Sequence, residues 1–383
     1  MVKNTKERII YAIINLSLIL IIASLTLFIY FVLKNDKEEI FNEYENNVNT
    51  IFSTLEAQTN NIVTETLTEN KETLVIPVEE IPIYNNEEYD FTKINNNRYY
   101  YNQLDDTAKS IYDSIEKNLN NMKSGNYQIK LPNTVSDVLK NGSGEEVLQQ
   151  SFQSAWDALS LDRTDIFFID ISKITLRIKK TTYINRTSYS LIIIPEDENG
   201  YLEDGIENKD MVEQMLNKTK NSRDEIINSI SGDTYTKVLQ IHDWIIENLE
   251  YSSDFQNANV YNIYGALIEK NAVCEGYAES FKYMLDELGI PCILVKGTAT
   301  NSEGITENHE WNYVKLEEKW YAVDVTWDDP ISKGLGYITN KEKHRYFLQG
   351  AETMNKKHIP KGKITEAGQE FVYPELEASE YKR

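Results

Sequence analysis

One cysteine in the C-terminal half of the sequence has the position expected of a catalytic nucleophile. Apolar residues recur at helical spacing after Cys274 and stop near Gly289, so we expect Cys274 at the N-terminus of a helix. The free N–H groups and the positive end of the helix dipole favour a thiolate there, and the same groups can hold an oxyanion. We therefore expect Cys274 to react with alkylating reagents even below neutral pH.

The side chains that could assist this thiol lie in the segment HEWNYVKLEEKWYAVDVTWDDP, which starts at His309. Alternating residues over 309–316 and 320–327 predict the two strands of a hairpin. If the loop is 317–318, His309 and Asp324 are diagonal neighbours on one face, and moving this two-residue loop back by one position makes them direct neighbours. A three-residue loop without a bulge would place them on opposite faces. With either two-residue loop the carboxylate can orient the imidazole, which gives a Cys-His-Asp set.

The second cysteine, Cys292, falls in the apolar run that follows the predicted helix, and we expect it to be an unreactive core residue. A disulfide between Cys274 and Cys292 is the competing structural interpretation. His242 lies beside the buried stripe of another predicted helix, and we expect it at a boundary or on the surface.

The composition excludes several classes of function. The 383 residues include 61 acidic and 39 basic ones, and the resulting charge of -22 would repel phosphate backbones, so we expect no nucleic-acid partner. Two cysteines cannot form a disulfide framework, and no CxxC or His-rich cluster offers a zinc site. We expect no cofactor, although Asp328 and Asp329 leave calcium open as an alternative to capping a turn before Pro330.

Residues Ile9 to Leu33 are free of charged side chains and are long enough for a membrane-spanning helix. The apolar run continues where a signal peptide would carry small residues, so we expect an uncleaved anchor. Lys3, Lys6 and Arg8 precede it, which predicts a cytoplasmic N-terminus and an extracytoplasmic remainder. The acidic, cysteine-poor chain suggests a bacterial cell surface.

The sequence pattern predicts six segments: a cytoplasmic tail (1–8), a transmembrane helix (9–33), a stalk and linker (34–98), a smaller α+β domain (99–205), a second α+β domain (206–350) and a C-terminal extension (351–383). Within the smaller domain we expect helices over 105–122 and 145–159 and strands over 165–170, 174–178 and 189–194. An interrupted heptad in the stalk allows weak self-association, and a disordered tether is the alternative.

Three segments, IHDWIIENLEY, AVCEGYAESFKYMLDELGIPC and the hairpin that starts at His309, resemble the transglutaminase-like superfamily over about residues 234–350. The resemblance implies a papain-like cysteine hydrolase fold of circularly rearranged order. It also implies that Cys274 is the nucleophile, His309 the general base and acid, and Asp324 the residue that orients His309.

The sequence departs from animal transglutaminases, which place a tryptophan well before the cysteine to stabilise the oxyanion. No tryptophan stands between Trp244 and Cys274, and Tyr251, Tyr261 or Tyr264 could supply an O–H donor instead. We expect thiol-dependent acyl transfer on amide bonds, by hydrolysis or transamidation, on a surface protein or a cell-wall peptide. The alternative is a non-catalytic module that binds such peptides on the same fold.

Overall fold

The computed structural model describes residues 64–65, 88–93, 97–140, 143–183, 186–329 and 340–383. The described residues all fall in one compact unit by their contacts, so the predicted boundary near residue 205 stays a prediction. No helix of the described residues has the length and apolar character needed to cross a membrane. The predicted span Ile9 to Leu33 and the predicted heptad of the stalk up to residue 63 lie outside the described residues.

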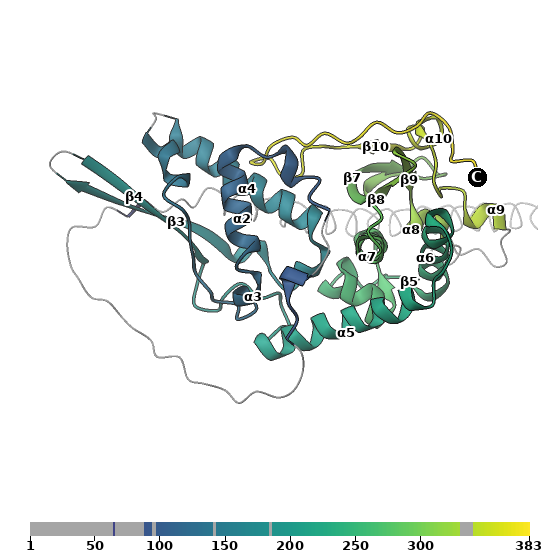
Figure 1. Cartoon of the computed structure of the whole chain (residues 1–383), viewed down its shortest axis with the longest axis horizontal. Coiled ribbons are helices and arrows are strands. Elements are labelled where there is room, and N and C mark those ends of the chain that lie inside the picture. The colour runs from purple at the N-terminus through teal and green to yellow at the C-terminus, as the bar shows by residue number, and fades with distance from the viewer. Residues whose placement is uncertain (1–63, 66–87, 94–96, 141–142, 184–185, 330–339) are drawn as a thin grey trace, which may run out of the picture. The chain divides into compact units, whose positions relative to one another are not determined.

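The N-terminal part combines helices with a four-stranded sheet of order β1-β3-β4-β2, as expected for an α+β region (Figure 1). Asp105 caps the first helix by accepting a hydrogen bond from the N–H of Ala108 at 2.7 Å, and Ala108, Ile111 and Ile115 on one face of this helix are buried. The elements are β1 (Thr64–Glu65), α2 (Asp106–Glu116), α3 (Leu119–Met122), β2 (Ile129–Lys130), α4 (Gly144–Asp162), β3 (Ile174–Tyr183) and β4 (Arg186–Pro195).

The predicted strand over 165–170 is wrong. Residues Thr164–Ile166 form a turn of 3-10 helix directly after α4. Asp165 is held there by Arg163, whose Nε and terminal nitrogen lie 2.8 and 2.7 Å from its two carboxylate oxygens. The bidentate pair fixes a tight turn that alternating apolar residues alone would not reveal.

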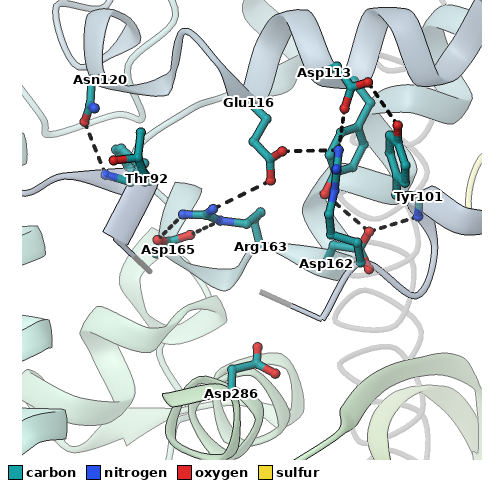
Figure 2. A network of polar contacts seen from close by, with 12 residues as sticks. Thr92, Tyr101, Asp113, Glu116, Asn120, Asp162, Arg163, Asp165 and Asp286 are labelled. Carbon is teal, nitrogen blue, oxygen red and sulfur yellow. Dashed lines mark hydrogen bonds and ion pairs between the residues drawn. The ribbon is translucent and has the colours of Figure 1, made fainter. Parts of the chain in front are cut away.

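This pair belongs to a polar network at the end of α4, which Figure 2 shows together with Glu116, Asp162 and Asp286. The backbone N–H groups of Tyr100 and Tyr101 donate to the Asp162 carboxylate at 3.0 and 2.9 Å. The buried ammonium of Lys282 donates to the carbonyl of Asp162 at 3.0 Å and is paired with Asp286. Because Lys282 and Asp286 belong to helix α7 (Cys274–Glu287), the network fastens this helix to the N-terminal part.

A second four-stranded sheet, of order β10-β7-β8-β9, carries the site. Helix α7 packs against β7 and β8, and helices α5 and α6 pack against α7 (Figure 1). The main elements are α5 (Lys209–Asn228), α6 (Thr234–Asn248), β5 (Glu250–Tyr251), β6 (Asn271–Ala272), α7, β7 (Cys292–Thr300), β8 (Thr306–Leu316), β9 (Lys319–Val323), α8 (Val325–Asp328), α9 (Asn340–Lys343), α10 (Ala351–Met354) and β10 (His358–Pro360).

The hairpin of β8 and β9 has the predicted two-residue loop. Glu317 and Glu318 are both left-handed, with φ of 50° and 65°, and Leu316 pairs with Lys319. Positive φ at both loop residues is typical of a turn whose twist matches that of the flanking strands.

The predicted second strand is wrong beyond Val323, where β9 ends. Asp324 caps α8 instead, because its Oδ1 accepts the N–H of Trp327 at 3.0 Å. In a strand that ran on to Trp327, Thr326 would stand opposite His309 across the 317–318 loop. Thr326 is helical instead and does not pair with His309. The predicted proximity of His309 and Asp324 survives, since Asp324 directly follows the last strand residue.

The C-terminal extension 351–383 returns to both parts of the fold. It supplies the edge strand β10, paired with β7, and then runs beside α4 (Figure 1). Thr365 donates to Asp157 at 2.8 Å, and the N–H of Gln369 donates to Ser154 at 2.8 Å. Phe371 is buried in the same core as α4, so this segment is an integral part of the folded unit.

Candidate active site

His309 and Asp324 form a buried pair at the end of the β8–β9 hairpin. Nε2 of His309 lies 2.8 Å from Oδ2 of Asp324, and the carboxylate has no exposed surface. Burial raises the pKa of Asp324, but the charge of His309 and the hydrogen bonds from His309 and His358 outweigh it and hold the pKa below its usual range. An ionised carboxylate can only accept, so Nε2 of His309 carries a proton and Nδ1 is the atom left to act as a base.

Burial lowers the pKa of His309, but the charges of Asp324, Glu275 and Glu310 outweigh it and raise that pKa above the usual value. Trp311 stacks beside this imidazole, with ring centroids 5.9 Å apart and planes 19° apart, and Trp327 lies on it at 5.6 Å. The ring is therefore fixed both by its carboxylate and by aromatic neighbours.

Cys274 is the first residue of α7, as predicted, and it is buried. The first turn of α7 packs closely against the backbone of Val260 at Gly276, where a Cβ would lie 2.8 Å from the Val260 carbonyl oxygen. The backbone N–H of Glu310, the neighbour of His309 on β8, donates to the thiol. This bond places the sulfur beside the strand that carries the imidazole.

The electrostatics of the thiol differ from the expected thiolate. Burial, together with the nearby carboxylate of Glu275, raises the pKa of Cys274 well above its usual value, and the N–H of Glu310 only partly opposes this. The S–H donates to Oε2 of Glu275 at 3.3 Å. Among the described residues no hydrogen bond joins the thiol to His309, and the thiol contacts Glu275 instead.

A third histidine, His358, completes the group, and the sequence interpretation missed it. Its Nε2 lies 2.8 Å from Oδ2 of Asp324, the same oxygen that receives His309. His358 opens strand β10, beyond the predicted end of the domain at residue 350. The only signal in the sequence was that it is one of four histidines.

The surface position expected of His242 is wrong, because its side chain is fully buried. Nδ1 lies 3.1 Å from Asp243 and Nε2 lies 3.2 Å from Asp328. Burial lowers the pKa of His242, but its hydrogen bonds to Asp243 and Asp328 outweigh it and raise the pKa. Nε2 of His344 donates to the same Asp243 oxygen at 2.6 Å, so His242 belongs to a structural network.

The carboxylates considered for calcium lie in the core. Asp328 accepts the N–H of Tyr346 at 2.9 and 3.0 Å, and Asp329 accepts the hydroxyl of Tyr277 at 2.6 Å. Among the described residues, two other groups bring imidazole and carboxylate atoms within 4.8 Å: His242, Asp243 and His344, and His309, Asp324 and His358. In both groups the candidate ligand atoms are hydrogen-bonded to one another.

Cys292 is a buried core residue, as predicted, and both cysteines are free, so the alternative of a disulfide is wrong. Among the tyrosines considered as oxyanion donors, burial, Glu275 and then Cys274 raise the pKa of Tyr261. Its hydroxyl donates to the carbonyl of Phe255 at 3.2 Å. Tyr261 therefore lies near the thiol.

Residues 222–325 match the model of the transglutaminase-like superfamily. The human kyphoscoliosis peptidase is 26% identical over 162 residues, which cover 38% of this chain and 24% of that protein, and the mouse protein of the same name is 25% identical over 162 residues. The chain thus spans about a quarter of the length of these curated relatives.

Two solved structures are more distant. A crystal structure of a TGase is 15% identical with a TM-score of 0.28, covering 46% of this chain and 50% of that one. The periplasmic domain of TgpA from Pseudomonas aeruginosa is 16% identical with a TM-score of 0.24, covering 39% and 58%. At these TM-scores neither structure informs the chemistry of this chain. The family match covers Cys274, His309 and Asp324, and residues 222–325 of this chain form a domain of the transglutaminase-like superfamily.

Proposed function

We propose that this domain transfers acyl groups from amide bonds through Cys274, His309 and Asp324. The observation that carries the proposal is the buried 2.8 Å contact between His309 and Asp324, on the hairpin whose backbone also donates to the Cys274 thiol. An imidazole fixed by a carboxylate, on the strand whose backbone also donates to a helix-start thiol, is compatible with the arrangement that nucleophilic catalysis requires. The superfamily match over 222–325 supports the same chemistry in general terms.

In the proposed reaction Nδ1 of His309 takes the thiol proton while the sulfur of Cys274 attacks the carbonyl carbon of an amide. The resulting oxyanion is stabilised by free N–H groups at the start of α7. Collapse breaks the C–N bond, the departing amine receives the proton from His309, and a thioester remains. Water or a second amine then attacks the thioester, gives its proton to His309, and restores the thiol when that proton returns to sulfur.

A specific observation favours a second candidate, a non-catalytic module that binds peptides. The Cys274 thiol is hydrogen-bonded to the carboxylate of Glu275, and the pKa of the thiol is raised. A binding module has no need of an ionised cysteine, whereas an enzyme must break this contact before the thiol can attack. The two candidates therefore differ in whether Cys274 ever becomes bonded to a substrate.

We further propose that the domain faces the outside of a bacterial cell, with Ile9 to Leu33 as its membrane anchor, and that it acts on surface proteins or cell-wall peptides. The charge-free stretch and the basic residues before it support this orientation. A protease-cleavable tag inserted after residue 40 is expected to be cut in intact cells. Protection of the tag until the cells are lysed would contradict the orientation.

The reaction is tested by intact-mass measurement of the full chain incubated with a pool of cell-wall peptides and primary amines. The expected result is a thioester mass on Cys274, together with hydrolysed peptide or an amine adduct, and the loss of all of these in Cys274→Ala. Peptide that binds the wild-type chain and Cys274→Ala equally, with neither adduct nor product, would favour the binding module.

A further inference from the structure

We propose that His358 is a positioning residue of the active site, which holds the Asp324 carboxylate in the orientation that serves His309. This inference rests on the proposed function and adds a residue outside the matched region 222–325.

The sheet brings the two imidazoles to one face. On β8, His309 lies opposite Gly297 of β7, and on the other side of β7, His358 lies opposite Ala299. Directly opposed residues share a face, as do residues two apart along a strand, so both histidines project from the same side of the sheet. The residues between them on β7 are the small Gly297 and Ala299, which leaves the two ring centroids only 5.7 Å apart.

Asp324 is held by three donors. Its Oδ1 accepts the N–H of Trp327 at 3.0 Å, and its Oδ2 accepts Nε2–H groups from His309 and His358, both at 2.8 Å. The first bond comes from the helix cap and the other two from strands on either side of β7. Removing His358 leaves one lone pair of a fully buried carboxylate without its donor, so the carboxylate is free to turn toward His309 or away from it.

The other nitrogen of His358 shows that this side chain is a donor to Asp324 and little else. His358 is 1% exposed, and its Nδ1 has no hydrogen-bond partner among the residues that the structure describes. The pattern is that of the Nε2–H tautomer, with a lone pair on Nδ1. Around the imidazole lie the rings of Trp327, Trp311 and Tyr346, with centroids 4.6, 5.1 and 5.6 Å away. Within the described part of the chain, the hydrogen bond of this ring is the one to Asp324.

Because His309 and His358 share the Asp324 carboxylate, His358 also limits how strongly Asp324 raises the pKa of His309. The charged groups that face His309 are Asp324, Glu275 of α7 and Glu310 of β8, while Asp324 itself faces His309, His358 and, from α8, Asp328. The N–H of His358 draws on the negative charge of Asp324. Without that N–H, Asp324 stabilises the protonated form of His309 more strongly, so His309 becomes a usable base only at higher pH.

Two substitutions separate the donor from the volume that it fills. His358→Gln keeps an N–H near the position of Nε2, whereas His358→Phe fills the site without a donor. Ile359→Gln is the matched control, since Ile359 is the next residue of the same edge strand and its side chain is 60% exposed. Circular dichroism and the melting temperature of each full-length variant establish that it is folded.

The first measurement is proton NMR of the 15N-histidine-labelled chain, which has four histidines. Besides the signals of His242 and His344, which contact Asp243 and Asp328, the wild type is expected to show two strongly downfield imidazole N–H signals that disappear together in Asp324→Asn. His358→Gln and His358→Phe each lose one of these two signals. A single Asp324-dependent signal in the wild type, unchanged by His358→Phe, would overturn the proposal without any appeal to activity.

The second measurement is the rate of Cys274 alkylation by iodoacetamide as a function of pH. For His358→Phe the midpoint of the acid limb is expected to move up by roughly one pH unit, and the rate near neutral pH to fall by roughly tenfold. His358→Gln is expected to recover most of the wild-type midpoint and most of the wild-type rate. Ile359→Gln is expected to match the wild type. A folded His358→Phe with a wild-type midpoint, or with only a lower melting temperature, would reduce His358 to a packing role.

Failure of the proposed function has a different signature. If His309→Ala leaves the alkylation profile of Cys274 unchanged, the catalytic proposal fails, whereas a response to His309→Ala but not to His358→Phe refutes only the positioning role. Zinc provides the remaining outcome. Stoichiometric Zn²⁺ binding by the wild type that His358→Phe abolishes would replace the positioning role with a metal site.

Discussion

The thiol of Cys274 donates to the carboxylate of Glu275, the next residue in helix α7, at 3.3 Å. This contact sets two features of the helix start against each other. The free N–H groups of the first turn favour negative charge, whereas the Glu275 carboxylate and the burial of the sulfur raise the pKa of Cys274. The carboxylate thus favours the protonated form of the Cys274 thiol.

Glu275→Gln is therefore expected to increase the rate of Cys274 alkylation near neutral pH by about tenfold, because it removes a negative charge next to the sulfur and so lowers the pKa of the thiol. Glu279→Gln is the control, since Glu279 lies four residues further on the same helix and is not the carboxylate that accepts the S–H of Cys274. Equal rates for wild type and Glu275→Gln would show that Glu275 does not restrain the thiol.

The pair of His309 and Asp324 predicts a pH-dependent stability. The pKa of Asp324 is lowered on folding, so its contribution is present above the unfolded value and is lost as pH falls through the folded one. The pKa of His309 is raised, so its contribution is present below the unfolded value and is lost as pH rises through the folded one. Both contributions coexist between about pH 4 and about pH 6.5.

Asp324→Asn is accordingly expected to lower the free energy of unfolding by about 2 kcal/mol in that window, and by less above it. Urea unfolding of wild type and variant at a series of pH values measures the difference. A difference that does not vary with pH would mean that the pair is not charged in the folded state.

Local sequence patterns predicted most of the scaffold. Alternation and a two-residue loop gave the hairpin, and helical periodicity gave α7 with Cys274 at its first residue, because these features depend on neighbours in sequence. The change from strand to helix at Asp324 also had a local signal, an aspartate at an N-cap position, but the alternating pattern through Trp327 masked it.

The missed residues depend on distant contacts. His358 reaches Asp324 only because β10 pairs with the edge of β7, and no local pattern predicts which edge a three-residue strand joins. The raised pKa of Cys274 depends on burial, as does the position of His242 between Asp243 and Asp328. The position of Cys274 at a helix N-terminus predicted a lowered pKa for the thiol. The residues next to Cys274 in the sequence do not reveal how deeply the sulfur is buried, so the opposite effect of burial was missed.

The ion pair between Lys282 and Asp286 at the far end of α7 is buried, so Lys282→Met is expected to cost about 3–5 kcal/mol of stability by leaving Asp286 uncompensated. Burial raises the pKa of Asp286 to about 6, against the effect of Lys282, so the loss should be larger above that pH than below it. Urea unfolding measures both.

Lys220→Met is the matched control. Lys220 and Asp224 form a pair of the same i,i+4 spacing at 2.7 Å on α5, but their side chains are 40% and 32% exposed. Loss of this exposed ion pair in Lys220→Met should lower the free energy of unfolding by about 0.5 kcal/mol or less. Similar costs for Lys220→Met and Lys282→Met would contradict the role given to the buried pair, and the double variant Lys282→Met with Asp286→Leu should recover much of the loss.

The central claim is that His309 acts as the base for Cys274, and the most direct test is the pH dependence of Cys274 alkylation between about pH 5 and about pH 9 in wild type and His309→Ala. Cys292, fully buried on the same molecule, reports any unfolding. In the wild type the rate should rise through a midpoint above about 6.5, because the pKa of His309 is raised and only its neutral form accepts the thiol proton. His309→Ala should lose this step and react only at the higher pH where an unassisted, buried thiol ionises. Superimposable profiles in the two proteins would contradict the claim, and would leave the domain as a binding module on a transglutaminase-like fold.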